Sequence, residues 1–250
     1  MTEQIGVEKR DGYAIVTMNK PKRRNALGTE SMAGLLSSLT SLSSDPTCRA
    51  IVLTGAPPAF CAGSDLKELG GLSIEAMCAH EDETARIARR FGHLPIPVIA
   101  AVEGYALGGG FILATSCDVV VTAKSAKWNL PEVRNGWLPP WGLQTLLARV
   151  GPVKARLITW GITEIDGAEA VRLGIADAVV EDGGALDHAC ELAERLAALP
   201  ANAVRSTKRY FEAAAANDSE RQDAEASRLF AEDAGSETAQ ATLAKFAVKP

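Results

Sequence analysis

The sequence predicts a mixed α/β fold with a mostly parallel sheet, because short apolar runs alternate with segments of helical periodicity. The clearest runs of β character cover residues 13–18, 50–54, 97–102 and 118–123. Between them, apolar side chains recur at helical spacing, as Met32, Leu35 and Leu39 do. Strands and helices that alternate in this way form parallel sheets. At 250 residues the chain is long enough for one large domain or two smaller ones.

In the first half, the predicted elements are a strand at 13–18, a basic loop at 22–27, a helix at 29–42, a strand at 50–54 and a polar helix at 74–92. Thr29 is expected to cap the first helix, and Asp45-Pro46 ends it. The many charges of the polar helix favour a solvated face. A loop that contains Gly55 and two prolines follows the second strand.

In the second half, the predicted elements are a strand at 97–102, a helix from 111, a strand at 118–123, an extended turn at 128–133, helices at 141–150 and 153–160, and a strand or turn at 174–180. Gly151-Pro152 separates the two middle helices. Helices at 185–199, 201–216 and 219–234 and a short piece ending at Pro250 complete the chain. We therefore divide it into a core at 1–190 and a helical C-terminal region at 191–250.

Composition and charge exclude several classes of function. The net charge is −5, and no basic run is longer than Lys22-Arg23-Arg24, so a nucleic-acid partner is not expected. No signal peptide and no apolar run of membrane-spanning length are present, so no membrane association is expected. The five cysteines are widely spaced without a CxxC pair, which favours free thiols in the cytoplasm. The three histidines form no ligand motif, so no metal is expected.

A glycine triplet follows the strand at 97–102 and precedes a helix. Such a turn leaves backbone N–H groups free to face an anion, and glycine lets a ligand approach closely. Phe111 replaces the lysine of a P-loop, and Leu113 replaces the last glycine of a dinucleotide fingerprint. The alternative is a turn that only packs a strand against a helix.

Motifs along nearly the whole chain resemble the crotonase superfamily, which includes enoyl-CoA hydratases and isomerases. The matching stretches lie at 19–27, 51–66, 97–110, 131–139, 161–174 and 206–208. The resemblance implies a crotonase-like spiral of short ββα units with an α-helical C-terminal subdomain. It also implies trimers, commonly paired into hexamers, with C-terminal helices that close a neighbouring site.

In that family the anion is the enolate of an acyl-CoA thioester. The resemblance implies that the backbone N–H groups of Ser64 and Gly109 hold the thioester oxygen. Donors of this kind act mainly as charge develops in the transition state. Ser64 lies in no Gly-x-Ser-x-Gly elbow, so a nucleophilic serine is not expected.

The resemblance also assigns coenzyme A to the basic loop and the segment at 62–66. The implied contacts are Lys22, Arg24, Ala26, Ala62, Ser64, Asp65 and Leu66, with Ile112 and Trp141 near the acyl group. Phe246 and Lys249 match an aromatic-x-x-lysine pattern that closes the site from a neighbouring subunit. The alternatives are a solvated turn at Lys22 and Arg24 and a free terminal lysine. Coenzyme A belongs to the substrate, so no separate cofactor is expected.

The residues that carry protons depart from the hydratase pattern. Hydratases place one glutamate two residues after the triplet, where this chain has Ile112, and a second where it has Glu132. A single carboxyl suffices for double-bond isomerisation, so the sequence favours an isomerase in which Glu132 removes and returns the proton. Apolar neighbours such as Trp141 are expected to raise the pKa of Glu132. The alternative is that Glu132 only caps the turn after Pro131.

Two other functions stay open. Hydratase, decarboxylase or hydrolase chemistry would need a second polar residue from the segment at 66–92, where the candidates are Glu68, Glu75, Glu81, Asp82, Glu83 and Arg86. Nothing in the sequence selects among them. The third possibility is a homologue that binds acyl-CoA without turning it over.

Overall fold

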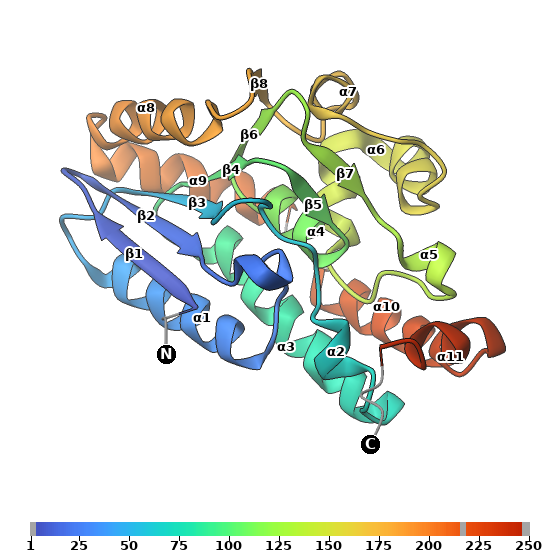
Figure 1. Ribbon diagram of the computed structural model, residues 1–250. Helices are drawn as coiled ribbons and strands as arrows, with labels where there is room; N and C mark the ends of the chain where they lie inside the picture. The colour runs from blue at the N-terminus through green and yellow to red at the C-terminus, as the bar shows by residue number, and fades with distance from the viewer. Residues whose placement is uncertain (1–3, 216–218, 247–250) are drawn as a thin grey trace.

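The computed structural model describes residues 4–215 and 219–246 (Figure 1). Its main sheet has the order β1-β2-β3-β4-β6-β8. The strands are β1 (Ile5–Lys9), β2 (Tyr13–Met18), β3 (Ala50–Gly55), β4 (Val98–Val102), β6 (Val119–Ala123) and β8 (Ala178–Val180). Only the β1–β2 pair is antiparallel, so the predicted mostly parallel α/β sheet is confirmed. A second parallel pair joins β5 (Tyr105–Leu107) to β7 (Lys127–Asn129).

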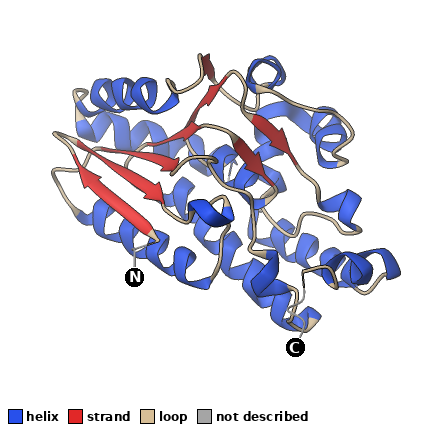
Figure 2. Ribbon diagram, in the orientation of Figure 1, coloured by secondary structure: helices blue, strands red, loops and turns tan. Residues whose placement is uncertain are grey.

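Helices cover both faces of the main sheet (Figure 2). They are α1 (Thr29–Ser44), α2 (Leu66–Leu69), α3 (Ile74–His93), α4 (Gly109–Thr115), α5 (Glu132–Asn135), α6 (Leu143–Thr159), α7 (Gly167–Leu173), α8 (Ala185–Ala197), α9 (Ala201–Ala215), α10 (Ser219–Ala234) and α11 (Glu237–Leu243). A short 3₁₀ turn, η1 (Pro21–Arg23), precedes α1.

Alternate residues of the central strands enter two different cores. On β3, Ile51 and Leu53 face the larger core beneath α1 and α3, whereas Ala50 and Val52 face α8. Alanines at every fourth position of α8 allow that helix to lie close to the sheet. Because both faces are covered, β3 and β4 consist of apolar runs without alternation, and this made them predictable.

Several boundaries differ from the predictions. Strand β1 was not predicted, because it lies at the sheet edge and only Ile5 is buried. Gly28, rather than Thr29, is the cap residue of α1, and its N–H donates to the Ser31 hydroxyl. The two middle helices join as α6, which is kinked where Gly151 adopts φ 75°.

The charged helix α3 is not simply solvated. Its buried side chains are Met77, Glu81, Thr84, Ala85, Ile87, Ala88 and Phe91. They pack against α1 on one side and α10 on the other. One carboxylate therefore lies on the inward face of this helix.

The C-terminal helices pack on their own chain. Helix α10 contacts α3, and α11 contacts α5, around a core that contains Trp137, Phe230 and Leu243 (Figure 1). Phe230 of α10 and Leu243 of α11 line a cavity of their own chain, and the closing of a neighbouring subunit's site by these helices stays a prediction. Residue 190 lies inside α8, which packs on the sheet, and the division at that residue stays a prediction. In the described part of the chain, no helix is long and apolar enough to cross a membrane.

Candidate active site

Each glycine of the triplet lies in close contact with a neighbouring group. Gly108 has φ 53°, and a Cβ there would lie 2.7 Å from Glu132 Oε1. A Cβ on Gly109 would lie 2.9 Å from the Trp141 ring, and one on Gly110 would lie 2.2 Å from the Cys61 carbonyl oxygen. The triplet thus brings the start of α4 against Glu132 and Trp141.

Two backbone segments, those of Gly63 and Gly109, lie close together beside this turn. Gly109 is the first residue of α4, so its N–H has no acceptor within the helix. A Cβ on Gly63, which has φ 85°, would lie 3.0 Å from Gly109 N. Leu27 N donates to Gly63 O, and Asp65 N donates to Leu27 O, both at 2.8 Å. Because N–H groups alternate along an extended segment, the N–H of Ser64 faces away from Leu27.

A cavity of about 70 Å³ opens beside these groups. Its walls come from the segment after β3, from α3, from the triplet, from the turn at 131–141, and from α10 and α11. The lining residues include Ala62, Ser64, Leu66, Glu81, Gly109, Ile112, Glu132, Trp137, Trp141, Phe230 and Leu243. It is largely apolar, with two carboxyl groups.

Glu132 presents an unpaired oxygen to this cavity. Its Oε2 is buried and has no hydrogen-bond partner among the described residues. Burial is the main cause that raises the pKa of Glu132 to about 8. A hydrogen bond from its own backbone N–H opposes this rise, and the nearby charge of Glu81 adds to it. The predicted rise in pKa is confirmed in direction and cause. A carboxyl with a pKa near neutrality is suited to acid–base catalysis.

The raised pKa of Glu132 predicts a pH-dependent loss of stability. The folded chain holds this proton up to about pH 8, whereas the unfolded chain releases it near 4.5. The contribution of this proton to the free energy of unfolding is complete below about pH 4.5 and is lost as pH rises to about 8. Glu132→Gln should therefore gain on the order of 1–4 kcal/mol relative to wild type between pH ~5 and ~9. Melting curves at both pH values test this, and an equal difference at both would contradict it.

Glu81 is the functional candidate that sequence reasoning did not select. Glu81 is 4% exposed, and its Oε2 accepts a hydrogen bond from Trp141 Nε1 at 2.7 Å. Burial raises its pKa, while hydrogen bonds from Ser64 and Trp141 oppose the shift. One buried stripe of α3 contains Met77, Glu81 and Thr84. The sequence signal for Glu81 was therefore a carboxylate at a position where the helical repeat places buried side chains.

Ile112 and Trp141, which were predicted to lie near an acyl group, both line the cavity. Both are buried, at 1% and 2% exposure. Gly142, which follows the indole, has φ 72°, and a Cβ there would lie 2.1 Å from the Ile112 side chain. Ile112 and the segment at 141–142 therefore pack closely against each other at the cavity wall.

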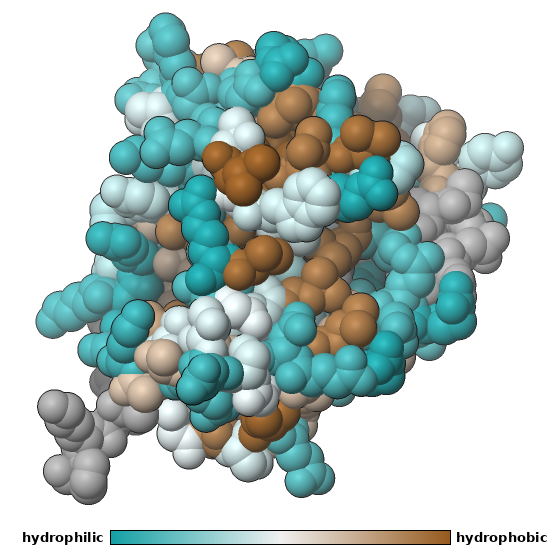
Figure 3. All heavy atoms as spheres, turned by 90° about the vertical axis from the view of Figure 1, so that its right-hand side faces the viewer, coloured by the Kyte–Doolittle hydropathy of each residue, from teal (hydrophilic) through white to brown (hydrophobic). Residues whose placement is uncertain are grey.

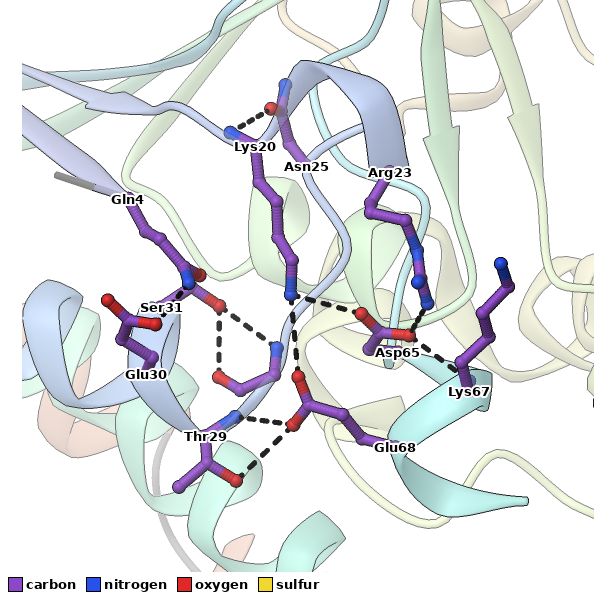
Figure 4. A network of polar contacts seen from close by, with 11 residues as sticks. Gln4, Lys20, Arg23, Asn25, Thr29, Glu30, Ser31, Asp65, Lys67 and Glu68 are labelled. Atoms are coloured by element: carbon purple, nitrogen blue, oxygen red, sulfur yellow. Dashed lines mark hydrogen bonds and ion pairs between the residues drawn. The ribbon is translucent and has the colours of Figure 1, made fainter. Parts of the chain in front are cut away.

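The cationic side chains in and just before the basic loop differ in their contacts. Lys20 and Arg23 pair with the buried carboxylate of Asp65, Lys20 at 3.1 Å (Figure 4). Asp65 also accepts from Lys67 N and so caps α2. Its side chain is thus occupied by protein partners. Lys22 is exposed, and the guanidinium of Arg24 lies 5.0 Å from the centre of the Tyr105 ring.

The remaining predicted contacts lie at or beside the same cavity. Ala62 and Leu66 line it, and Ala26 is buried in the basic loop, which is tied to this segment by Ala62 N donating to Arg24 O at 3.0 Å. Phe246 follows α11 and is partly buried. Lys249 lies outside the described residues. Phe230 and Leu243 also line the cavity and were not predicted.

Across residues 4–215 and 219–246, no three histidine, cysteine, aspartate or glutamate side chains are grouped so that they could hold an ion.

Comparison with known proteins agrees with this architecture. Residues 8–249 match the family model described as enoyl-CoA hydratase/isomerase. A probable enoyl-CoA hydratase of Mycobacterium bovis is 39% identical over 211 residues, which cover 82% of this chain and 80% of the relative. A crotonyl-CoA hydratase of Syntrophomonas wolfei is 34% identical over 210 residues, with 82% and 80% covered.

Solved structures give the same result. The crystal structure of an enoyl-CoA hydratase/isomerase from Mycobacterium paratuberculosis has a TM-score of 0.88 at 29% identity and covers 98% of this chain and 99% of that chain. One from Xanthobacter autotrophicus also has a TM-score of 0.88, at 28% identity, and covers 96% and 91%. The crotonase-like fold is therefore confirmed, and the chain belongs to the enoyl-CoA hydratase/isomerase family.

Proposed function

We propose that the protein acts on enoyl-CoA thioesters and that Glu132 transfers a proton at the carbon next to the thioester carbonyl. The observation that carries this proposal is the unpaired Oε2 of Glu132, buried in the cavity beside the glycine triplet. An unpaired buried carboxyl oxygen is costly, and such costs are concentrated where a group must meet a reacting atom.

The backbone N–H groups of Gly109 and Ser64 are the proposed donors to the thioester oxygen. The short separation between Gly63 and Gly109 N supports this, because it brings both segments to one edge of the cavity. Negative charge that develops on the oxygen as a proton moves would be stabilised there.

Two net reactions can follow from this proton transfer. Isomerisation needs Glu132 alone, and the apolar Ile112 favours it. Hydration needs a second carboxyl, and Glu81 lies in the same cavity. The two relatives named above by sequence carry the names of hydratases, and the two solved structures carry the name hydratase/isomerase. We therefore propose hydration as the net reaction and keep isomerisation as the second candidate, in place of the preference drawn from Ile112 alone.

Coenzyme A is proposed to lie along the basic loop. Lys22 and Arg24 are exposed there, next to the segment at 62–66 that lines the cavity. Cationic side chains at this edge suit the phosphates of coenzyme A. Lys20 and Arg23 hold Asp65 and are not proposed as phosphate ligands.

Self-association into trimers or hexamers also remains a proposal. Apolar side chains gather on the face that contains α5 and α6 (Figure 3). The exposed apolar residues of these helices and the segment after them are Val133, Val153, Leu157, Trp160 and Ile162. A gathered apolar surface of this kind supports contact with another chain.

A panel of thioesters tests the proposed function. Crotonyl-CoA reports hydration, 3-hexenoyl-CoA reports isomerisation, and a malonyl-type thioester reports decarboxylation. We expect loss of the conjugated double bond of crotonyl-CoA with formation of 3-hydroxybutyryl-CoA. Conversion of 3-hexenoyl-CoA alone would favour the second candidate. Binding without conversion of any member would overturn the proposal in favour of an acyl-CoA-binding protein.

A further inference from the structure

We propose that Glu81 is a second catalytic carboxylate, which takes a proton from the water molecule that adds to the β-carbon. This inference rests on the proposed action on enoyl-CoA thioesters. Glu81 would supply from α3 the carboxylate that α4 lacks, because Ile112 lines the cavity there.

The surroundings of Glu81 leave it able to exchange a proton. A glutamate on the inward face of a helix is costly unless it is paired or has a task. The hydrogen-bond donors to Glu81 are the indole N–H of Trp141 and the hydroxyl of Ser64, both neutral. Neutral donors orient a carboxylate and favour its charged form, but they do not fix a permanent ion pair.

Glu81 and Glu132 approach the cavity from different walls. Glu81 comes from α3, and Glu132 is the first residue of α5. They are close enough for the charge of Glu81 to raise the pKa of Glu132. The cavity of about 70 Å³ has room for about two water molecules at their liquid volume. Water and both carboxyl groups therefore share one small space.

The two carboxyl groups divide the addition between them. The water oxygen bonds to the β-carbon, and one of its protons passes to the Glu81 carboxylate. The double-bond electrons move toward the thioester oxygen, and Glu132, protonated up to about pH 8, gives its proton to the α-carbon. The substrate has then gained one water, and proton transfer from Glu81 to Glu132 restores both groups.

Glu81→Gln separates the two proton transfers. Glutamine keeps an oxygen that accepts from Trp141, but it cannot take a proton from water. Glu83→Gln is the matched control, because Glu83 lies on the same helix and pairs with the exposed Arg86. Two rates are measured for each variant: hydration of crotonyl-CoA, and exchange of the α-hydrogens of butyryl-CoA in D₂O, which needs no added water.

We expect Glu81→Gln to lose about 10²–10⁴-fold in hydration and to keep α-hydrogen exchange within about threefold of wild type. Glu83→Gln should keep both rates. Hydration that survives in Glu81→Gln would overturn the role of Glu81, as would a parallel loss of both rates, which indicates a structural part only. Failure of the proposed function itself looks different: wild type would then show neither reaction, or Glu132→Gln would leave exchange unchanged.

Discussion

Glutamine in place of Glu132 is expected to lower turnover of enoyl-CoA thioesters by about 10²–10⁴-fold. The substitution keeps the size of the side chain but removes the proton that the α-carbon receives. Binding should change little, because the cavity and the backbone N–H groups are unaltered. Steady-state kinetics on crotonyl-CoA and calorimetry with butyryl-CoA measure the two effects separately.

The pH profile of the wild-type enzyme gives an independent check on Glu132. If its protonated form donates to the α-carbon, kcat/KM for hydration should fall as pH rises through about 8. Glu164→Gln, at an exposed position outside the cavity, is the matched control and should retain the full rate and the same profile. Turnover by Glu132→Gln within about threefold of wild type would show that Glu132 is not the acid.

Proline at position 109 is expected to abolish most activity by removing one backbone donor. Gly109 is the first residue of α4, a position where proline is compatible with a helix. Loss of one such donor typically costs ~2.7–4 kcal/mol, or about 10²–10³ in kcat.

Gly109→Ala is the control for the added side chain. Its Cβ would press on the Trp141 ring at 2.9 Å, but its N–H is retained. We expect alanine to lose some activity and proline to lose about 10²–10³-fold more. Melting temperatures of both variants report how far the contact with Trp141 disturbs the fold. Equal activity in the two variants would mean that the N–H of residue 109 does not stabilise the thioester oxygen.

Residues with a strong local signal made most of the fold predictable. The strands β3 and β4 are buried on both faces, and their continuous apolar runs predict them. The edge strand β1 buries only Ile5, and the pair β5 and β7 is three residues long on each side, so their sequences carry little periodicity. The C-terminal helices were predicted, but their place over their own cavity depends on tertiary packing.

The candidate site was predictable where backbone and motif define it. Gly109, Ser64 and Glu132 follow from short matched stretches, and all three line one cavity. Glu81 was one of several acidic residues on a charged helix, and only packing against Trp141 distinguishes it. For the same reason, sequence could not tell which cations of the basic loop are used by Asp65.

The most direct test of the account is the exchange of the α-hydrogens of butyryl-CoA with D₂O, followed by mass spectrometry. This saturated thioester can neither add water nor move a double bond, so exchange reports proton transfer at the α-carbon alone. We expect deuterium at the α-carbon with wild type and a rate lower by about 10²-fold or more with Glu132→Gln. No exchange by wild type, or equal exchange by both, would contradict it.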